Sequence, residues 1–222
     1  MTGQVNPPQR KLTSPKRYCK LPGLFFLCVI LLPVILIFGC ARYEVKNIDS
    51  AGRDIICFGN SITAGLGVSR EDSYPLVLSE LTGYPIINSG RSGDTSSDGL
   101  KHLEKGVLSY QPRLVIIEFG GNDFLRRVPL DHTINNIRAM VEQIQARGSM
   151  VAIADVSSGV IMSNYRKRYK NLARQTQAIF IPNLLEGIIN NPSLKQDTIH
   201  PNAGGHRIIA ERIYKAIKPY LK

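Results

Sequence analysis

The chain has 222 residues, 43% of them hydrophobic, and a formal net charge of +11. This length supports one sizeable core and excludes two ordinary domains with further segments. Five of the 28 Lys and Arg residues lie in residues 1–39, which contain no acidic residue, so the other 183 residues carry a surplus of +6. A surplus of this size does not by itself indicate a nucleic-acid-binding protein, and we expect no nucleic-acid partner.

The N-terminus is predicted to be a targeting segment. A polar, basic stretch precedes residues 21–39, which are 19 residues without a charge. A basic flank followed by an apolar run is typical of a signal peptide, and 19 apolar residues are also long enough to span a bilayer uncleaved. In both cases the basic flank stays in the cytoplasm and the folded domain lies on the other side of the membrane.

Cys40 follows this apolar run in the stretch Ile-Phe-Gly-Cys, residues 37–40. The stretch resembles the lipobox of bacterial lipoproteins, in which a small residue precedes a cysteine that is acylated and becomes the first mature residue. Phe38 departs from that pattern, and the alternative is that Cys40 is the last residue of an uncleaved anchor. We therefore predict a signal peptide or membrane anchor over 1–39, a suspected lipidation site at Cys40, and a linker over 40–53.

Residues 54–222 are predicted to form one α/β domain. The expected strands are Asp54–Gly59, Pro85–Asn88, Leu114–Phe119, Met150–Val156 and Ala178–Ile181. The third and fourth are nearly continuous apolar runs, as expected for strands that are covered on both faces. Helices are predicted between and after them, over 97–109, 131–147, 166–177 and 203–217. This alternation indicates a parallel sheet with helices on both faces, in which functional groups gather beyond the carboxyl ends of the strands.

Ser61 directly follows the first expected strand, in the stretch Phe-Gly-Asn-Ser. Most serines in such a position only cap the next helix, and the alternative is a nucleophile. A nucleophilic serine needs a general base, a group that orients the base, and donors for the oxyanion. The interpretation of Ser61 therefore depends on what the rest of the chain supplies.

Asp197 and His200 stand just before the last expected helix, in the stretch Asp-Thr-Ile-His-Pro. An Asp three residues before a His in a turn lets the carboxylate reach the Nδ1–H of the ring, which leaves Nε2 free as a base. The alternative is that the two residues only shape the turn into the helix. Because a base must be neutral to accept a proton, we expect the rate of such an enzyme to fall at acid pH.

Two further stretches contain candidate oxyanion donors. Asn122 follows the third expected strand after two glycines, which let the backbone turn tightly and bring the side-chain amide to the edge of the sheet. The alternative is that Asn122 caps a turn. Gly93 offers an unshielded backbone N–H, and its alternative is an ordinary loop glycine in front of a helix that Asp94 or Ser96 caps.

These four stretches, in this order and at these places, resemble the four blocks of the SGNH/GDSL hydrolases, which contribute Ser, Gly, Asn and His. The resemblance runs from about residue 54 to residue 221 and is nearest to the bacterial extracytoplasmic branch of thioesterase I, lysophospholipase and arylesterase. It also includes Gln-Pro-Arg at 111–113 and the stretch 164–169. It implies a three-layer α/β/α, flavodoxin-like domain over 54–222, with a five-stranded parallel sheet in the order 2-1-3-4-5.

The resemblance also implies a role for each matching residue. Ser61 is expected to be the nucleophile, His200 the base, and Asp197 the acid that orients the base. The expected donors of the oxyanion hole are the backbone N–H of Ser61, the backbone N–H of Gly93 and the side chain of Asn122. No metal and no organic cofactor is required by this chemistry.

Position 60 departs from the family pattern, which has Asp before the serine where this chain has Asn60. The Asp is expected to shape the serine turn by hydrogen bonding. Asn can accept similar hydrogen bonds but brings no charge. We therefore expect activity to survive with altered local electrostatics, the alternative being a catalytically inactive binding lipoprotein.

The function implied is that of a serine esterase that forms an acyl-enzyme. Its expected substrates are acyl esters or thioesters: lysophospholipids, aryl esters, or medium- or long-chain acyl esters. Two other classes stay open, an O-deacetylase of acetylated envelope polysaccharide and a non-enzymatic, flavodoxin-like binding module. We expect a monomer in the bacterial cell envelope, held to the membrane through its N-terminus, with the catalytic domain in the periplasm.

Overall fold

The computed structural model describes residues 2–4, 44–159 and 162–221. The suspected lipidation site Cys40 and, apart from residues 2–4, the predicted targeting segment 1–39 lie outside the described residues. Within the described part of the chain, no helix combines the length and the apolar character needed to cross a bilayer.

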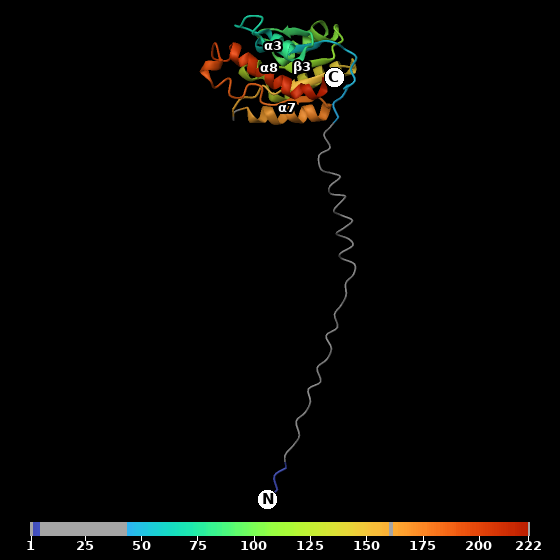
Figure 1. The fold of residues 1–222 in the computed structure, drawn as a ribbon, viewed down its shortest axis with the longest axis vertical. Helices are drawn as coiled ribbons and strands as arrows, with labels where there is room; N and C mark the ends of the chain where they lie inside the picture. Colours follow the sequence, from blue (N-terminus) through green and yellow to red (C-terminus); the bar gives the residue numbers. More distant parts are fainter. Residues whose placement is uncertain (1, 5–43, 160–161, 222) are drawn as a thin grey trace. The chain divides into compact units, whose positions relative to one another are not determined.

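Five parallel strands form one sheet within the compact unit Tyr43–Lys222 (Figure 1). They are β1 (Ile55–Gly59), β2 (Ile86–Gly90), β3 (Leu114–Glu118), β4 (Met150–Ala154) and β5 (Ile179–Ile181). Their order is β2-β1-β3-β4-β5, which confirms the fold that the resemblance implied. All five predicted strands exist, with ends that differ from the prediction by at most two residues.

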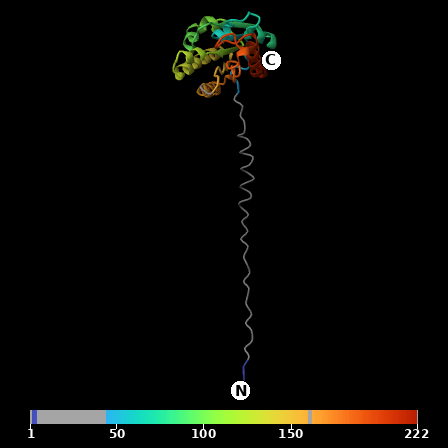
Figure 2. The ribbon, with the colours of Figure 1, turned by 90° about the vertical axis from the view of Figure 1, so that its left-hand side faces the viewer.

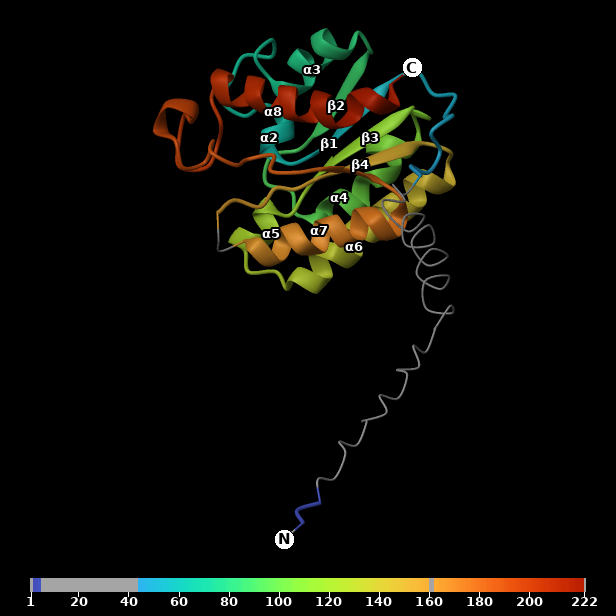
Figure 3. The ribbon, with the colours of Figure 1, turned by 60° about the horizontal axis from the view of Figure 1, so that its bottom comes forward.

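Helices cover both faces of this sheet (Figure 3). On one face lie α3 (Tyr74–Thr82) and α8 (Ala203–Ile217), which pack against each other. On the other lie α4 (Ser96–Leu103), α6 (Leu130–Ala146) and α7 (Ser163–Thr176). The view in Figure 2 likewise separates α8, in red, from α7, in orange. Because both faces are covered, β1, β3 and β4 are buried along their whole length, as their apolar runs indicate.

The helices differ from the prediction in several places, one of which is the start of α7, three residues earlier than predicted. The predicted helix over 97–109 is α4 followed by a wider π-helical turn, η1 (Glu104–Leu108). The helix α3 was not predicted, although Pro75 in its first turn and Gly83 after its end, with φ +71°, are ordinary boundary signals. Four shorter elements complete the domain: α2 (Ser61–Ala64), α5 (Gly121–Leu125), η2 (Pro192–Leu194) and η3 (Lys218–Tyr220).

The register of the strands brings three chain segments to one edge of the sheet. Gly59, the last residue of β1, pairs with Gly90 of β2 and with Glu118 of β3. Burying polar groups costs free energy unless they are hydrogen-bonded, so a cluster of them is informative. Many of the buried polar residues end or follow the strands at this edge: Asn60, Ser61, Thr63, Thr95, Ser96, Glu118, Asp123, Asp155 and Ser157.

Candidate active site

Ser61 is the first residue of α2, directly beyond the end of β1. The residue that caps this short helix is Asn60, whose Oδ1 accepts a hydrogen bond from the N–H of Ile62 at 3.0 Å. The alternative in which Ser61 caps the helix is therefore wrong. Its hydroxyl is left free to contact another group, although the residue is only 7% exposed.

The partner of the Ser61 hydroxyl is the ring of His200. Ser61 Oγ lies 2.9 Å from His200 Nε2, and His200 Nδ1 lies 2.7 Å from Oδ2 of Asp197. Ser61 and His200 are 139 positions apart, and His200 stands in the loop before α8. The start of α2 and the loop before α8 thus supply a continuous hydrogen-bonded chain of a hydroxyl, an imidazole and a carboxylate.

The turn that contains Asp197 holds its carboxylate in place. Oδ1 accepts the backbone N–H groups of Ile199, at 2.9 Å, and of His200, at 2.8 Å, while Oδ2 faces the ring. The backbone N–H and the ring of His200, together with the N–H of Ile199, lower the pKa of Asp197 to about 2. An ionised carboxylate at Nδ1 assigns the proton to that nitrogen, so Nε2 is the atom that can accept the proton of Ser61.

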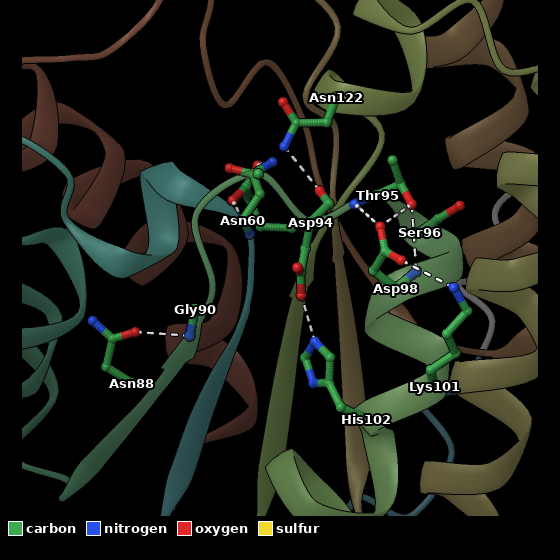
Figure 4. A network of polar contacts seen from close by, with 12 residues as sticks. Asn60, Asn88, Gly90, Asp94, Thr95, Ser96, Asp98, Lys101, His102 and Asn122 are labelled. Atoms are coloured by element: carbon green, nitrogen blue, oxygen red, sulfur yellow. Dashed lines mark hydrogen bonds and ion pairs between the residues drawn. The ribbon is translucent and has the colours of Figure 1, made fainter.

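Asn122 lies in the first turn of α5, beyond the end of β3. Its Nδ2 donates a hydrogen bond to the backbone oxygen of Asp94 at 2.9 Å, which joins the loops that follow β2 and β3 (Figure 4). An amide nitrogen carries two N–H groups, so the second one remains for a ligand. The alternative, a side chain that only caps a turn, does not describe this contact between two loops.

The chain enters α5 through Gly120, which has φ +113°. A Cβ at this position would lie 2.0 Å from the hydroxyl of Tyr169, which donates a hydrogen bond to the backbone oxygen of Phe119. Only glycine fits both the backbone conformation and this contact. Gly120 therefore allows the sharp turn that brings Asn122 over the end of β3.

Gly93 stands in the loop after β2 with φ +87°. Its carbonyl accepts a hydrogen bond from Arg126 at 2.8 Å, and its N–H has no acceptor among the described residues. The N–H of Ser61, at the first position of a helix, also has no partner within that helix. The three oxyanion donors expected from the sequence thus follow the neighbouring strands β2, β1 and β3.

Glu118, the last residue of β3, is an important residue that the sequence analysis did not identify. It is 1% exposed, and its carboxylate accepts hydrogen bonds from Nδ2 of Asn60 at 3.0 Å and from Oγ1 of Thr63 at 2.9 Å. Burial raises the pKa of Glu118 to about 7. The available signal was an acidic residue at the end of an otherwise apolar strand.

A cavity of about 260 Å³ opens beside Ser61 and is lined also by Asn122 and His200. A larger hollow of about 540 Å³, around residues 44–51, contains none of the predicted site residues. Most of the wall of the smaller cavity is apolar and includes Phe124, Val156, Met162, Leu185, Ile189 and Ile199. Among the described residues, no group of three or more His, Cys, Asp or Glu side chains is placed to hold a metal.

The model of the GDSL-like lipase/acylhydrolase family matches residues 57–208 of this chain, a range that contains Ser61, Gly93, Asn122, Asp197 and His200. The chain belongs to this family. The resemblance stated from the four sequence blocks is therefore confirmed, as is the expectation of a hydrolase. The match covers more than half of the chain and lies within the compact unit Tyr43–Lys222.

This GDSL hydrolase is similar to curated enzymes over most of their length. Esterase TesA of Pseudomonas aeruginosa is 28% identical over 201 residues, which cover 84% of this chain and 98% of that protein. Thioesterase 1/protease 1/lysophospholipase L1 of Escherichia coli K12 is 28% identical over 181 residues, which cover 77% of this chain and 86% of that protein.

Solved structures of the family share the fold. The psychrotrophic esterase EstA from Pseudoalteromonas sp., solved in a form inhibited by monoethylphosphonate, matches with a TM-score of 0.69 and 26% identity. The match covers 76% of this chain and 98% of that one. The GDSL hydrolase described here thus shares its fold with this esterase.

Proposed function

We propose that this GDSL hydrolase cleaves acyl esters or thioesters with a medium or long acyl chain, using Ser61 as nucleophile, His200 as base and Asp197 as the acid that orients the base. The observation that carries the proposal is the hydrogen-bonded chain Ser61–His200–Asp197 at an apolar cavity. The names of the curated relatives, which are an esterase and a thioesterase and lysophospholipase, support the same class of reaction.

In the first half-reaction, Oγ of Ser61 attacks the carbonyl carbon of the ester while Nε2 of His200 takes the hydroxyl proton. The electron pair of the carbonyl moves to its oxygen, where the N–H groups of Ser61 and Gly93 and the side chain of Asn122 receive the negative charge. Asp197 stabilises the imidazolium that forms. The imidazolium then donates its proton to the departing alcohol or thiol, and the acyl group stays on Ser61.

In the second half-reaction, water takes the place of the departed group. His200 removes a proton from the water, whose oxygen attacks the acyl carbon, and the same donors hold the second oxyanion. When this intermediate collapses, the proton returns to Oγ of Ser61 and the carboxylic acid leaves. The cycle is a ping-pong mechanism that consumes one ester and one water and regenerates the free Ser61 hydroxyl.

The shape and chemistry of the cavity favour an acyl chain over an acetyl group. Each methylene buried against an apolar wall contributes about 0.8 kcal/mol, which is roughly fourfold in kcat/KM. An acetyl group would leave most of the 260 Å³ cavity unfilled. Phe124, Leu125 and Ile199 line the cavity and are also 36 to 56% exposed, so the apolar surface continues beyond it and supports a longer chain.

The test of this proposal is hydrolysis of p-nitrophenyl acetate, octanoate and palmitate by the full chain in detergent, beside Ser61→Ala. Ser109→Ala, at an exposed position outside the cavity, is the matched control. We expect turnover that is highest on octanoate or palmitate, that is lost in Ser61→Ala and that is retained in Ser109→Ala. A phosphonate ester probe should add its mass to Ser61.

Three results would contradict the proposal in different ways. Equal turnover in the wild type and in Ser61→Ala would remove Ser61 as nucleophile. Turnover confined to the acetate would favour the O-deacetylase. The absence of turnover on every ester, together with no phosphonate labelling, would favour a binding protein.

We also propose that the enzyme is a monomer that is held at the periplasmic face of a membrane through its N-terminus. The support is the sequence pattern of a basic flank, an uncharged run over 21–39, and Cys40 after a glycine. Labelling of the full chain with a radioactive fatty acid should occur in the wild type and not in Cys40→Ser. Membrane association without labelling would instead indicate an uncleaved anchor.

A further inference from the structure

Asp94 and His102 form a largely buried polar pair behind the candidate oxyanion donors. Oδ2 of Asp94 lies 2.5 Å from Nε2 of His102, and the two side chains are 18% and 11% exposed. His102 belongs to α4, whereas Asp94 lies in the loop that follows β2. Neither residue is among those that line the cavity beside Ser61.

The backbone of Asp94 faces the active site while its side chain faces α4. Its carbonyl oxygen accepts the hydrogen bond from Nδ2 of Asn122 at 2.9 Å, and the residue before it is Gly93. In Figure 4 Asp94 lies between the two partners, with Asn122 on one side and His102 on the other. Asp94 thus binds the side chain of Asn122, directly follows Gly93 in the chain, and binds His102 of α4.

The segment around Gly93 extends beyond the sheet. The N–H of Arg91 donates to the Gly59 oxygen at 3.0 Å, the N–H of Asp94 donates to the Arg91 oxygen at 3.2 Å, and Arg126 donates to the Gly93 carbonyl. Gly93, with φ +87°, has the widest conformational freedom of any residue type. The next part of the loop is fixed, since Thr95 caps α4 and Ser96 donates both its N–H and its hydroxyl to Asp123. Between these two parts, the carboxylate of Asp94 is the side-chain group that ties the loop to α4.

The ring of His102 is itself held firmly. It packs edge-on against Phe58 of β1, with ring centroids 5.3 Å apart. Gly106 lies beside the ring, and a Cβ there would be 3.5 Å from Nδ1, an ordinary contact distance. Nδ1 is buried and has no hydrogen-bond partner among the described residues. An apolar side chain would avoid this unpaired atom, so what the histidine adds at this position is the contact between Nε2 and Asp94.

We propose that His102 is a positioning residue of the oxyanion hole, which acts through Asp94 on Gly93 and Asn122. The inference rests on the proposed function, in which these two residues stabilise the oxyanion. Donors of an oxyanion must be held close to their working positions before the reaction. Two backbone contacts also hold Asp94: its N–H donates to the Arg91 oxygen, and the N–H of Thr95 donates to Asp98, each at 3.2 Å. The bond from His102 adds a side-chain restraint to them, and without it the carbonyl that orients the amide of Asn122 is held less firmly.

The kinetic test compares His102→Leu, which has no donor, with His102→Gln, whose amide can still donate to Asp94. The matched control is His132→Leu, at an exposed position on the first turn of α6. We expect His102→Leu to lower kcat about 10- to 100-fold, which is less than the roughly 10²–10³ typical for removal of a donor itself. KM should change by less than about twofold, since the oxyanion contacts form in the transition state.

The conservative variant separates positioning from packing. His102→Gln should keep kcat within about threefold of the wild type, and His132→Leu should leave both constants unchanged. Asp94→Ala should lower kcat as His102→Leu does, and the double variant Asp94→Ala/His102→Leu should lose no more than either single variant, because one link is broken in all three. Far-UV circular dichroism and thermal unfolding show which variants are folded.

A spectroscopic measurement tests the inference apart from the reaction. The ¹H–¹⁵N NMR signals of the Asn122 side chain and of the Gly93 backbone should shift in His102→Leu and return toward wild-type positions in His102→Gln. If the wild type hydrolyses no ester, the proposed function fails, and these signals still decide whether His102 positions the two groups.

Several outcomes overturn the inference. One is a folded His102→Leu or Asp94→Ala with unchanged kcat and unchanged signals of Asn122 and Gly93. Another is an equal loss in His102→Leu and His102→Gln, which would mean that the ring acts only by packing. A rise in KM without a fall in kcat, or additive losses in the double variant, would also contradict it.

Discussion

Asn60 donates a hydrogen bond from its side-chain amide to the buried carboxyl group of Glu118, across 3.0 Å, while its Oδ1 accepts the N–H of Ile62. An amide donates at one end and accepts at the other, whereas a carboxylate only accepts. Asn60 therefore satisfies a helix N–H and a neighbouring carboxyl at once, in the residue that directly precedes Ser61. This contact gives a physical reason to expect that an amide can take the place of the family's Asp.

The first prediction concerns Asn60→Asp, which places two carboxyl groups about 3 Å apart, where both cannot be ionised together. The pair should hold one shared proton, and its loss at higher pH should disturb the turn that carries Ser61. We expect the melting temperature and kcat/KM of the variant to fall, relative to the wild type, between about pH 5 and about pH 8. If the melting temperature and kcat/KM of the variant change with pH as those of the wild type do, the amide of Asn60 is not needed.

The second prediction uses the pKa of Glu118, which burial raises from the ordinary 4.5 to about 7. Between these two values the folded protein keeps a proton that the unfolded chain has lost. The free energy of unfolding should therefore fall as pH rises through this window, by about 3 kcal/mol in total, and should not change further above it. Glu118→Gln removes this contribution.

The measurement for Glu118 is urea unfolding of wild type and Glu118→Gln at about pH 5 and about pH 8, with the difference between the proteins compared. The wild type alone is not sufficient, because burial lowers the pKa of His206 to about 4, and its stability contribution is lost as pH falls. The advantage of wild type over Glu118→Gln should shrink at the higher pH. If the difference in unfolding free energy between the two proteins is the same at both pH values, the pKa of Glu118 is not raised in the folded protein.

The third prediction is that Asn122→Ala lowers kcat about 10²–10³-fold and changes KM little, because the side chain acts on the oxyanion. Asn135→Ala, at an exposed position on α6, is the control and should behave as the wild type. Steady-state kinetics on p-nitrophenyl octanoate give both constants. A variant with raised KM and unchanged kcat would place Asn122 in substrate binding instead.

The fourth prediction concerns the length of the acyl chain. Ile189 lines the cavity, and Ile189→Phe should fill part of it. We expect kcat/KM on the octanoate to fall by about tenfold or more, while the acetate, which serves as internal control, changes by less than about threefold. Equal losses on both esters would indicate a damaged site, and no loss on either would place the acyl chain elsewhere.

Some features of the site could be predicted because they are local in the chain. Asp197 and His200 are three residues apart, so the contact between carboxylate and ring follows from one turn. The apolar runs of β3 and β4 indicate strands covered on both faces, and so a parallel sheet. The contact between Ser61 and His200 spans 139 positions, and only the resemblance to a family connected the two residues in advance.

Other features depend on how separate elements come together. Glu118 faces Asn60 because Gly59 and Glu118 are paired across β1 and β3, a register that no local pattern encodes. His102 reaches Asp94 because α4 packs behind the loop that connects β2 to α4. The amino-acid sequence by itself indicated the strands, most helices, the family and the candidate site residues, since these rest on local periodicity and short motifs. Only the tertiary structure decided which buried polar groups became partners, because hydrogen bonds between distant segments depend on the packing of the whole sheet.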